Sequence, residues 1–142
     1  MSDDRHARAL LALARIDFKS LTGMNNIEIF ADSVFGFHAQ QAVEKGIKAW
    51  LTFLNVCFPK THDLRKLMAM LEAHCEEDLE EWWPLIEYNP FAVQLRYHWP
   101  EMVDAPLDRA ESIQRIGQFL DRIEQHIQSH DSTRNTHGAS LS

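Results

Sequence analysis

The 142-residue sequence has few of the residues that build disulfide frameworks, long loops or membrane spans. Its two cysteines, Cys57 and Cys75, lack the CxxC spacing of a metal or redox site and are too few for a secreted disulfide scaffold. Five glycines and five prolines are too few for a low-complexity chain. No apolar run approaches the roughly 18 residues of a membrane-spanning helix. We therefore expect a cytoplasmic protein with two free thiols and no membrane partner.

Positive charge is also scarce, because 14 Lys and Arg residues are outnumbered by 21 Asp and Glu residues, for a net charge of −7. A broad basic surface for duplex DNA is therefore disfavoured. The charge is uneven: residues 1–75 hold nine basic and eight acidic residues, whereas residues 76–142 hold five and thirteen. All five lysines lie in the first part, whose charge balance is compatible with a local basic site.

No strand-like alternation is present, and apolar residues instead recur at helical spacing. The predicted helices cover residues 4–21, 27–56, 64–74 and 92–97, with a last helix after Pro106. Thr61 or His62 is expected to cap the third helix, and Asp104 the last. This pattern predicts an all-α fold, an antiparallel up-and-down bundle of four to five helices. The bundle should occupy residues 1–130, and the polar stretch 131–142 should be a disordered tail.

The second predicted helix carries three stripes when its residues are placed about 100° apart. One stripe is made of small residues and one of large apolar residues, which predicts a central helix that a neighbour approaches closely. The small stripe includes Ala39, Ala42, Gly46 and Ala49. The third stripe is polar and comprises His38, Gln41, Lys45, Lys48 and Thr52.

Two interpretations of the polar stripe are open. It is a solvated face in which Glu44 and Lys48 form an exposed pair one helical turn apart. Alternatively, it is an anion site, because two lysines and a histidine suit a phosphate group.

Three motifs follow one another along the chain: FHAQQAVEKGIKA at 37–49, PKTHDL at 59–64 and NPFAVQLRY at 89–97. In this order they resemble the HEPN domain family (higher eukaryotes and prokaryotes nucleotide-binding), in its branch with FHAQQAxEKxxKA, THDL and NPYAVxxRYP-like motifs. The resemblance implies a bundle of four or five helices that commonly forms a homodimer. It also implies a minimal nucleotidyltransferase as a partner, often in toxin–antitoxin or phage-defence systems.

Some members of this family are metal-independent ribonucleases that carry an Arg, four to six further residues and then a His. None of the eight histidines here has an Arg at that spacing, and only one residue separates Arg96 from His98. The departure favours a binding module over an enzyme. Arg96 and His98 are the catalytic candidates if the chain is a ribonuclease, and a purely structural, oligomerising module is the third alternative.

The predicted ligand is a nucleotide or single-stranded RNA, with no cofactor and no metal. The candidate ligand-binding residues are His38, Gln41, Lys45, Lys48, His62, Arg96 and Tyr97. A structural role is open for three of them, because His62 stands at a helix start, Arg96 beside aromatic residues and His38 beside the small stripe. His126 and His130 are four residues apart, but no further ligand stands near them for zinc.

Overall fold

The computed structural model describes residues 2–26, 28–96 and 107–141, and the side chains of residues 4–26, 28–92 and 107–129. Within these ranges four α-helices and one 3-10 helix follow one another: α1 Ser2–Gly23, α2 Asp32–Phe53, α3 Leu64–His74, η1 Glu80–Arg96 and α4 Arg109–Leu141. No strand occurs among the described residues. The predicted all-α helical bundle is thereby confirmed.

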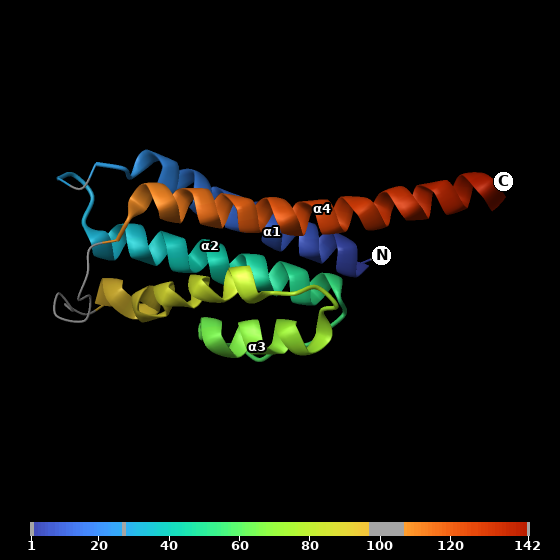
Figure 1. The fold of residues 1–142 in the computed structure, drawn as a ribbon, viewed down its shortest axis with the longest axis horizontal. Helices are drawn as coiled ribbons and strands as arrows, with labels where there is room; N and C mark the ends of the chain where they lie inside the picture. The colour runs from blue at the N-terminus through green and yellow to red at the C-terminus, as the bar shows by residue number, and fades with distance from the viewer. Residues whose placement is uncertain (1, 27, 97–106, 142) are drawn as a thin grey trace.

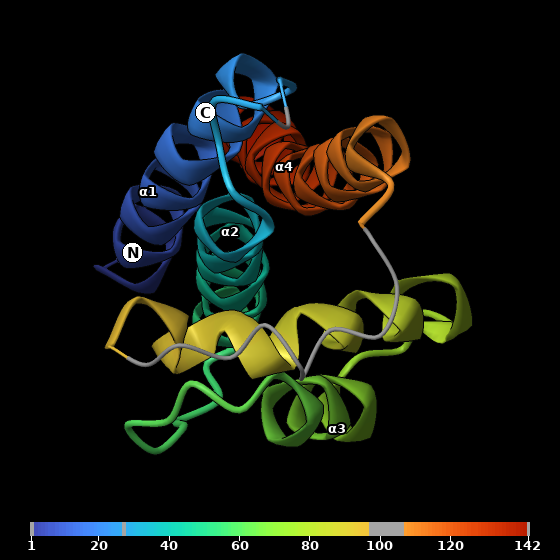
Figure 2. The same ribbon diagram turned by 90° about the vertical axis from the view of Figure 1, so that its left-hand side faces the viewer.

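The helix α2 is the centre of the bundle. It contacts each of the other helices, with α1 and α4 on one side and η1 and α3 on the other (Figures 1 and 2). Its large apolar residues Ile47, Trp50 and Leu51 are fully buried. A helix whose surroundings are almost all protein needs apolar residues on more than one face, which explains the two apolar stripes.

The small stripe of α2 is buried as predicted. Ala39, Ala42 and Ala49 are fully buried, and a Cβ atom added to Gly46 would lie 2.9 Å from Leu120 Cδ2 in α4. The close approach of α4 to α2 therefore depends on the missing side chain of Gly46.

The connection between α2 and α3 departs from a simple up-and-down order. Residues 54–63 run back along α2, so that the His62 carbonyl oxygen accepts a hydrogen bond from Gln40 Nε2 at 3.1 Å. Figure 1 accordingly shows α3 starting beside the middle of α2 rather than at its end. This return places the THDL motif against the FHAQQA motif.

Two helix starts differ from the prediction. The helix α2 begins at Asp32 rather than near residue 27. The cap of α3 is Asp63, not Thr61 or His62, because the Asp63 carboxylate accepts from the amides of Arg65 and Lys66. Thr61 Oγ1 instead accepts from the amide of Asp63 at 3.1 Å. Thr61 therefore orders the backbone of the residue that caps α3.

The expected short helix at 92–97 is wrong, because a 17-residue 3-10 helix, η1, ends there. A 3-10 helix has three residues per turn, so residues three apart lie on one face. The buried residues of this segment follow that period: Leu79, Trp82, Leu85, Tyr88 and Phe91. Pro84 and Pro90 lie inside η1, and each lacks an amide donor for an α-helical hydrogen bond.

The helix α4 begins at Arg109, where Asp108 Oδ1 accepts from the amide of Glu111 at 3.0 Å. The expected cap Asp104 and the residue Pro106 lie outside the described residues. The helix continues to Leu141 and projects beyond the other helices (Figure 1), where the composition predicted a disordered tail. No proline interrupts this stretch. The domain boundary at residue 130 stays a prediction.

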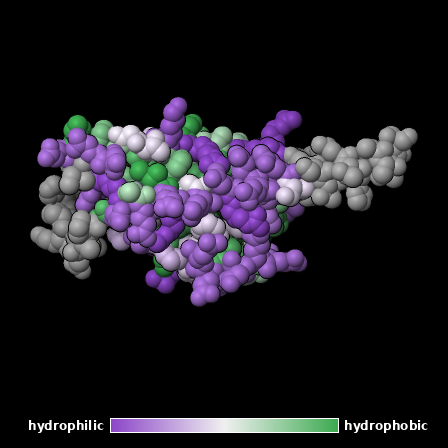
Figure 3. All heavy atoms as spheres, turned by 45° about the horizontal axis from the view of Figure 1, so that its top comes forward, coloured by the Kyte–Doolittle hydropathy of each residue, from purple (hydrophilic) through white to green (hydrophobic). Residues whose placement is uncertain are grey.

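The surface is mainly hydrophilic on the face drawn in Figure 3, with small apolar patches between the charged side chains. Leu13 and Ile16 of α1, 47% and 62% exposed, are among the large apolar residues that reach solvent. None of the described helices combines the length and the apolar composition needed to cross a bilayer.

Candidate functional site

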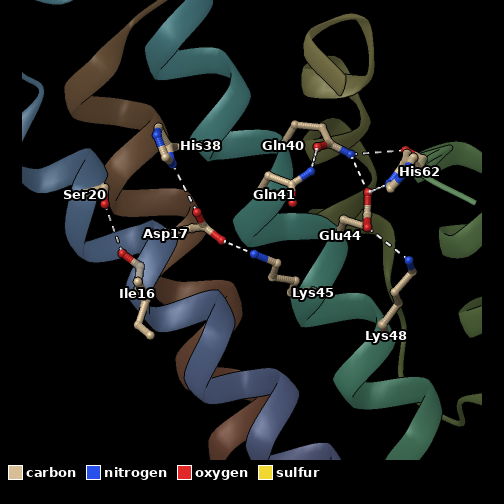
Figure 4. Close-up of polar contacts among 10 residues, drawn as sticks. All are labelled: Ile16, Asp17, Ser20, His38, Gln40, Gln41, Glu44, Lys45, Lys48 and His62. Atoms are coloured by element: carbon tan, nitrogen blue, oxygen red, sulfur yellow. Dashed lines mark hydrogen bonds and ion pairs between the residues drawn. The ribbon is translucent and has the colours of Figure 1, made fainter. Parts of the chain in front are cut away.

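A carboxylate of α1 joins two residues of the predicted polar stripe. Asp17 Oδ1 accepts from His38 Nδ1 at 3.1 Å, and Asp17 Oδ2 accepts from Lys45 Nζ at 2.6 Å. Figure 4 shows Asp17 reaching between these two side chains of α2. The three side chains are partly buried, and they link α1 to α2. We call them the Asp17 cluster.

A second carboxylate, Glu44 of α2, joins two further predicted residues. Glu44 Oε1 accepts from His62 Nδ1 at 2.8 Å, and Glu44 Oε2 accepts from Lys48 Nζ at 3.0 Å (Figure 4). The Glu44 side chain is only 5% exposed, whereas that of His62 is 67% exposed. The Glu44–Lys48 pair forms, but the interpretation that places it on a solvated face is wrong, because the Glu44 carboxylate is buried and is shared between Lys48 and His62. We call these three residues the Glu44 cluster.

The Asp17 cluster and the Glu44 cluster repeat one arrangement. In each, one carboxylate oxygen accepts from a histidine Nδ1 and the other accepts from a lysine ammonium. The carboxylate and the lysine cancel each other's charge. The net charge of each cluster is therefore set by the histidine, being zero with a neutral imidazole and +1 with a protonated one. A carboxylate that holds Nδ1–H also leaves Nε2 available to a ligand.

The buried amide of Gln40 completes the Glu44 cluster. Its Nε2 donates to Glu44 Oε1 at 2.9 Å and to the His62 carbonyl oxygen, while its Oε1 accepts from Gln41 Nε2 at 2.7 Å. Gln41 thus orients Gln40 and has no direct contact with the two carboxylates. An amide with both ends satisfied is held in one orientation.

The third motif is attached to the second through Asn89 of η1. Asn89 Oδ1 accepts from the amide of Leu64 at 2.8 Å, and Asn89 Nδ2 donates to Asp63 Oδ1 at 3.0 Å. Two residues later, the ring of Phe91 occupies the space that a side chain on Gly36 would need. The three motifs therefore form one connected network around the start of α3, and much of their sequence has a structural role.

The structure brings together only part of the predicted site. His38 and Lys45 belong to one cluster, Lys48 and His62 belong to the other, and Gln41 supports the second. Arg96 is the last residue of η1 and its side chain lies outside the described part. Tyr97 and His98 also lie outside the described residues.

The sequence interpretation missed Asp17 and Gln40 and placed Glu44 in solvent. Asp17 follows Ala14 by three residues on the face of α1 that buries Ala14 and Leu21. A carboxylate on an apolar face needs a partner, and that position was the available signal. Gln40 and Glu44 are one turn apart on α2, a spacing that predicts contact but not burial.

His126, one of the two histidines four residues apart in α4, packs against aromatic rings. The ring of His126 lies 5.4 Å from the ring of Trp50 and 5.9 Å from that of Phe53. Burial, with a smaller effect of Arg122, lowers the pKa of His126. The side chain of His130 lies outside the described part. Among the described residues, no three His, Cys, Asp or Glu side chains are grouped as metal ligands.

Comparison with known protein families identifies a family for this chain. A family model described as the HEPN domain matches residues 7–126, which include all three motifs. Searches of the curated proteins and of the solved structures give no match.

Proposed function

Because the chain belongs to the HEPN domain family, we propose that it is a dimeric module that binds the phosphate groups of a nucleotide or of single-stranded RNA. The observation that carries this proposal is the repeated arrangement along α2, in which a carboxylate and a lysine hold a histidine. Protonated histidine donates a hydrogen bond and a positive charge to an anion. The chain therefore has two places where anion affinity depends on an imidazole and not on a surplus of lysine.

Charge balance supports histidine as the phosphate contact. Lys45 and Lys48 were predicted as the phosphate ligands, but each lies within 3.0 Å of a carboxylate oxygen. A lysine already paired to a carboxylate attracts a further anion weakly, because the pair is close to neutral beyond a few ångströms. Their proposed role is to keep the carboxylates charged and the two histidines oriented.

The test is calorimetric titration of the protein with ATP and with a short oligouridylate, each at low and at high salt. Binding should weaken in His38→Gln/His62→Gln and should weaken with salt. His74→Gln is the matched control, since His74 is exposed and its Nδ1 lies 2.9 Å from the Met70 carbonyl oxygen of its own helix. Absence of binding to both ligands in the unaltered protein would contradict the proposal.

The proposed partners follow from the family resemblance. We expect a second copy of this chain and a minimal nucleotidyltransferase, as in toxin–antitoxin and defence systems. The exposed apolar residues of α1 are the surface for the second copy, since solvent exposure of two large apolar side chains one turn apart is costly. Co-purification of a tagged copy with an untagged copy tests the homodimer directly.

The experiment with RNA also tests the alternative that the protein is a ribonuclease. Side chains two positions apart point at least about 120° apart on an α-helix or a 3-10 helix, so one chain does not easily use both Arg96 and His98 on one phosphate. A general acid–base histidine and the Arg that holds the phosphate must reach the same group. Metal-independent cleavage of the oligouridylate that is lost in Arg96→Ala or His98→Ala would favour the enzyme.

A further inference from the structure

A short segment at the α2–α3 connection concentrates positive charge in an otherwise acidic protein. Lys60, Arg65 and Lys66 are exposed, and none of the described carboxylates lies within 4.0 Å of their charged groups. His62 stands between them in sequence. We call residues 60–66 the basic segment. Its one acidic residue is Asp63, whose carboxylate is directed at the amides of α3.

The start of α3 itself offers no anion site. The amide of Leu64 donates to Asn89 Oδ1, and the amides of Arg65 and Lys66 donate to Asp63 Oδ1. The first-turn donors that a helix would present to an anion are thus already bonded within the protein. An anion at the basic segment must therefore be held by side chains.

His62 is fixed at the centre of this segment by its ring and by its backbone. Its Nδ1 donates to the buried Glu44 carboxylate, and its carbonyl oxygen accepts from Gln40. Nδ1 and Nε2 lie on different edges of an imidazole ring. With Nδ1 directed at a buried carboxylate and the side chain 67% exposed, Nε2 is on the solvent side.

We propose that the basic segment, with His62 at its centre, binds the backbone of a single-stranded polynucleotide. This inference rests on the proposed phosphate-binding function and names the place and the ligand class. Lys60 lies in the loop before α3, and Arg65 and Lys66 lie in the first turn of the helix, all of them exposed. Exposed cations spread over a loop and a helix start can contact successive phosphates of a strand, whereas a single nucleotide is normally enclosed in a cavity.

The His62 ring adds a directional contact to the exposed cations. The Glu44 carboxylate holds Nδ1 at 2.8 Å, which leaves Nε2 for a phosphate oxygen. A protonated imidazole donates a hydrogen bond from this atom to an anion.

The site is tested by fluorescence anisotropy with labelled oligouridylate and oligothymidylate that carry no terminal phosphate. Arg65→Ala/Lys66→Ala should weaken binding roughly tenfold at 50 mM salt and lower the magnitude of the log–log salt slope by about 1.4, since each contacted phosphate contributes about 0.7. Arg5→Ala/Lys19→Ala is the matched control, because it removes one Arg and one Lys from the exposed surface of α1. Equal weakening in the two variants would overturn the site.

The contribution of His62 is tested with the same oligonucleotides at 50 mM salt. His62→Gln should weaken binding, whereas His74→Gln should bind like the unaltered protein. Lys60→Ala should weaken binding as well. Binding that is unchanged in His62→Gln and weakened in His38→Gln would overturn the assignment.

The two proposals fail in different ways. If neither oligonucleotide nor ATP binds the unaltered protein, the phosphate-binding function itself is wrong. If they bind but Arg65→Ala/Lys66→Ala binds as well as the unaltered protein, only the basic segment is wrong. Tighter binding of ATP than of either oligonucleotide also overturns the strand proposal, and oligouridylate against oligothymidylate distinguishes RNA from DNA.

Discussion

The Asn89 side chain of η1 lies against the Asp63 cap of α3, with Nδ2 donating to Asp63 Oδ1 at 3.0 Å. The same carboxylate oxygen accepts from the first-turn amides of α3, and Asn89 Oδ1 accepts from the remaining amide, that of Leu64. Two motifs that are 25 residues apart in sequence therefore share one capping arrangement. Asn89 is a structural residue whose loss should loosen the segment that carries His62.

Replacement of Asn89 by Ala should destabilise the protein by about 1–2 kcal/mol, because it removes a cap interaction and leaves the Leu64 amide without its acceptor. The free energy of unfolding in urea measures the change. Asn25→Ala, at an exposed position in the α1–α2 connection, is the control and should be close to neutral. Equal stability of Asn89→Ala and the unaltered protein would show that the capping arrangement contributes nothing.

Acid should weaken the same arrangement. The hydrogen bond from Asn89, followed by those from the amides of Lys66 and Arg65 and the Arg65 charge, lowers the pKa of Asp63 below its ordinary value of 3.8, although partial burial acts in the opposite direction. A pKa that is lower in the folded state stabilises the fold above the ordinary value, and this stabilisation is lost as the pH falls through the folded-state pKa.

Asp63→Asn should therefore lose less stability than the unaltered protein between pH 6 and about pH 3. Urea unfolding at the two pH values gives the difference. Asn can still accept from the α3 amides, so the variant should fold. Parallel losses in both proteins would contradict the role of the Asp63 charge.

The close approach of α2 and α4 makes Gly46 sensitive to size. Gly46→Leu should destabilise the protein by about 1–3 kcal/mol or more, since even a Cβ would lie 2.9 Å from Leu120 Cδ2 and 3.2 Å from Phe119 Cε2. Thermal unfolding measures the effect. Gly23→Leu is the control, because a Cβ at Gly23 would meet nothing within 4 Å. An unchanged melting temperature in Gly46→Leu would contradict the packing.

Much of the fold was predictable because local patterns determine it. The third helix ends at His74 as its spacing indicates, and the small stripe of α2 is buried where α4 approaches. The 3-10 helix was missed because apolar residues were compared with a period of 3.6, whereas those of η1 recur every third residue. The three-residue period was visible in the sequence.

The site was less predictable because its chemistry depends on pairing between helices. The wheel of α2 placed His38 and Lys45 together but contains no information about Asp17, which α1 contributes. In the same way, burial of Glu44 depends on the return of residues 54–63 along α2. The pattern placed His38, Lys45 and Lys48 on one stripe of α2, and the tertiary fold supplied the carboxylates that they contact.

Arg109 is a buried residue that the sequence did not single out. Its guanidinium donates to the carbonyl oxygens of Met24 and Phe30 at 2.7 and 2.6 Å and to Asp32 Oδ1 at 2.8 Å. It thereby fixes the α1–α2 connection to the start of α4. A lysine has a single ammonium group and cannot reproduce the planar fork of these contacts.

Arg109→Lys should therefore destabilise the protein by about 2–4 kcal/mol, because it leaves partly buried acceptors without the donors of the buried guanidinium. Urea unfolding measures the loss. Arg115→Lys is the control, since Arg115 pairs with Glu111 one turn away on the surface of α4, where such pairs contribute about 0.5 kcal/mol or less. Comparable stability of the two variants would contradict a structural role for Arg109.

The exposed apolar residues of α1 make the homodimer testable. Leu13 and Ile16 are one turn apart on α1 and are 47% and 62% exposed. Light scattering after size exclusion at tens of micromolar protein should give twice the 16.5 kDa of one chain. Leu13→Ser/Ile16→Ser should give a monomer with an unchanged melting temperature, because the substituted side chains add little to the core of a single chain.

Ile29→Ser is the matched control for that experiment, because Ile29 is also a large exposed apolar residue, 70% exposed, but lies in the connection between α1 and α2. It should leave the dimer intact if the α1 surface is the contact. A 16.5 kDa species for the unaltered protein would contradict the homodimer. A dimer that persists in Leu13→Ser/Ile16→Ser would instead place the contact on another surface, since apolar area removed from the interface must weaken association.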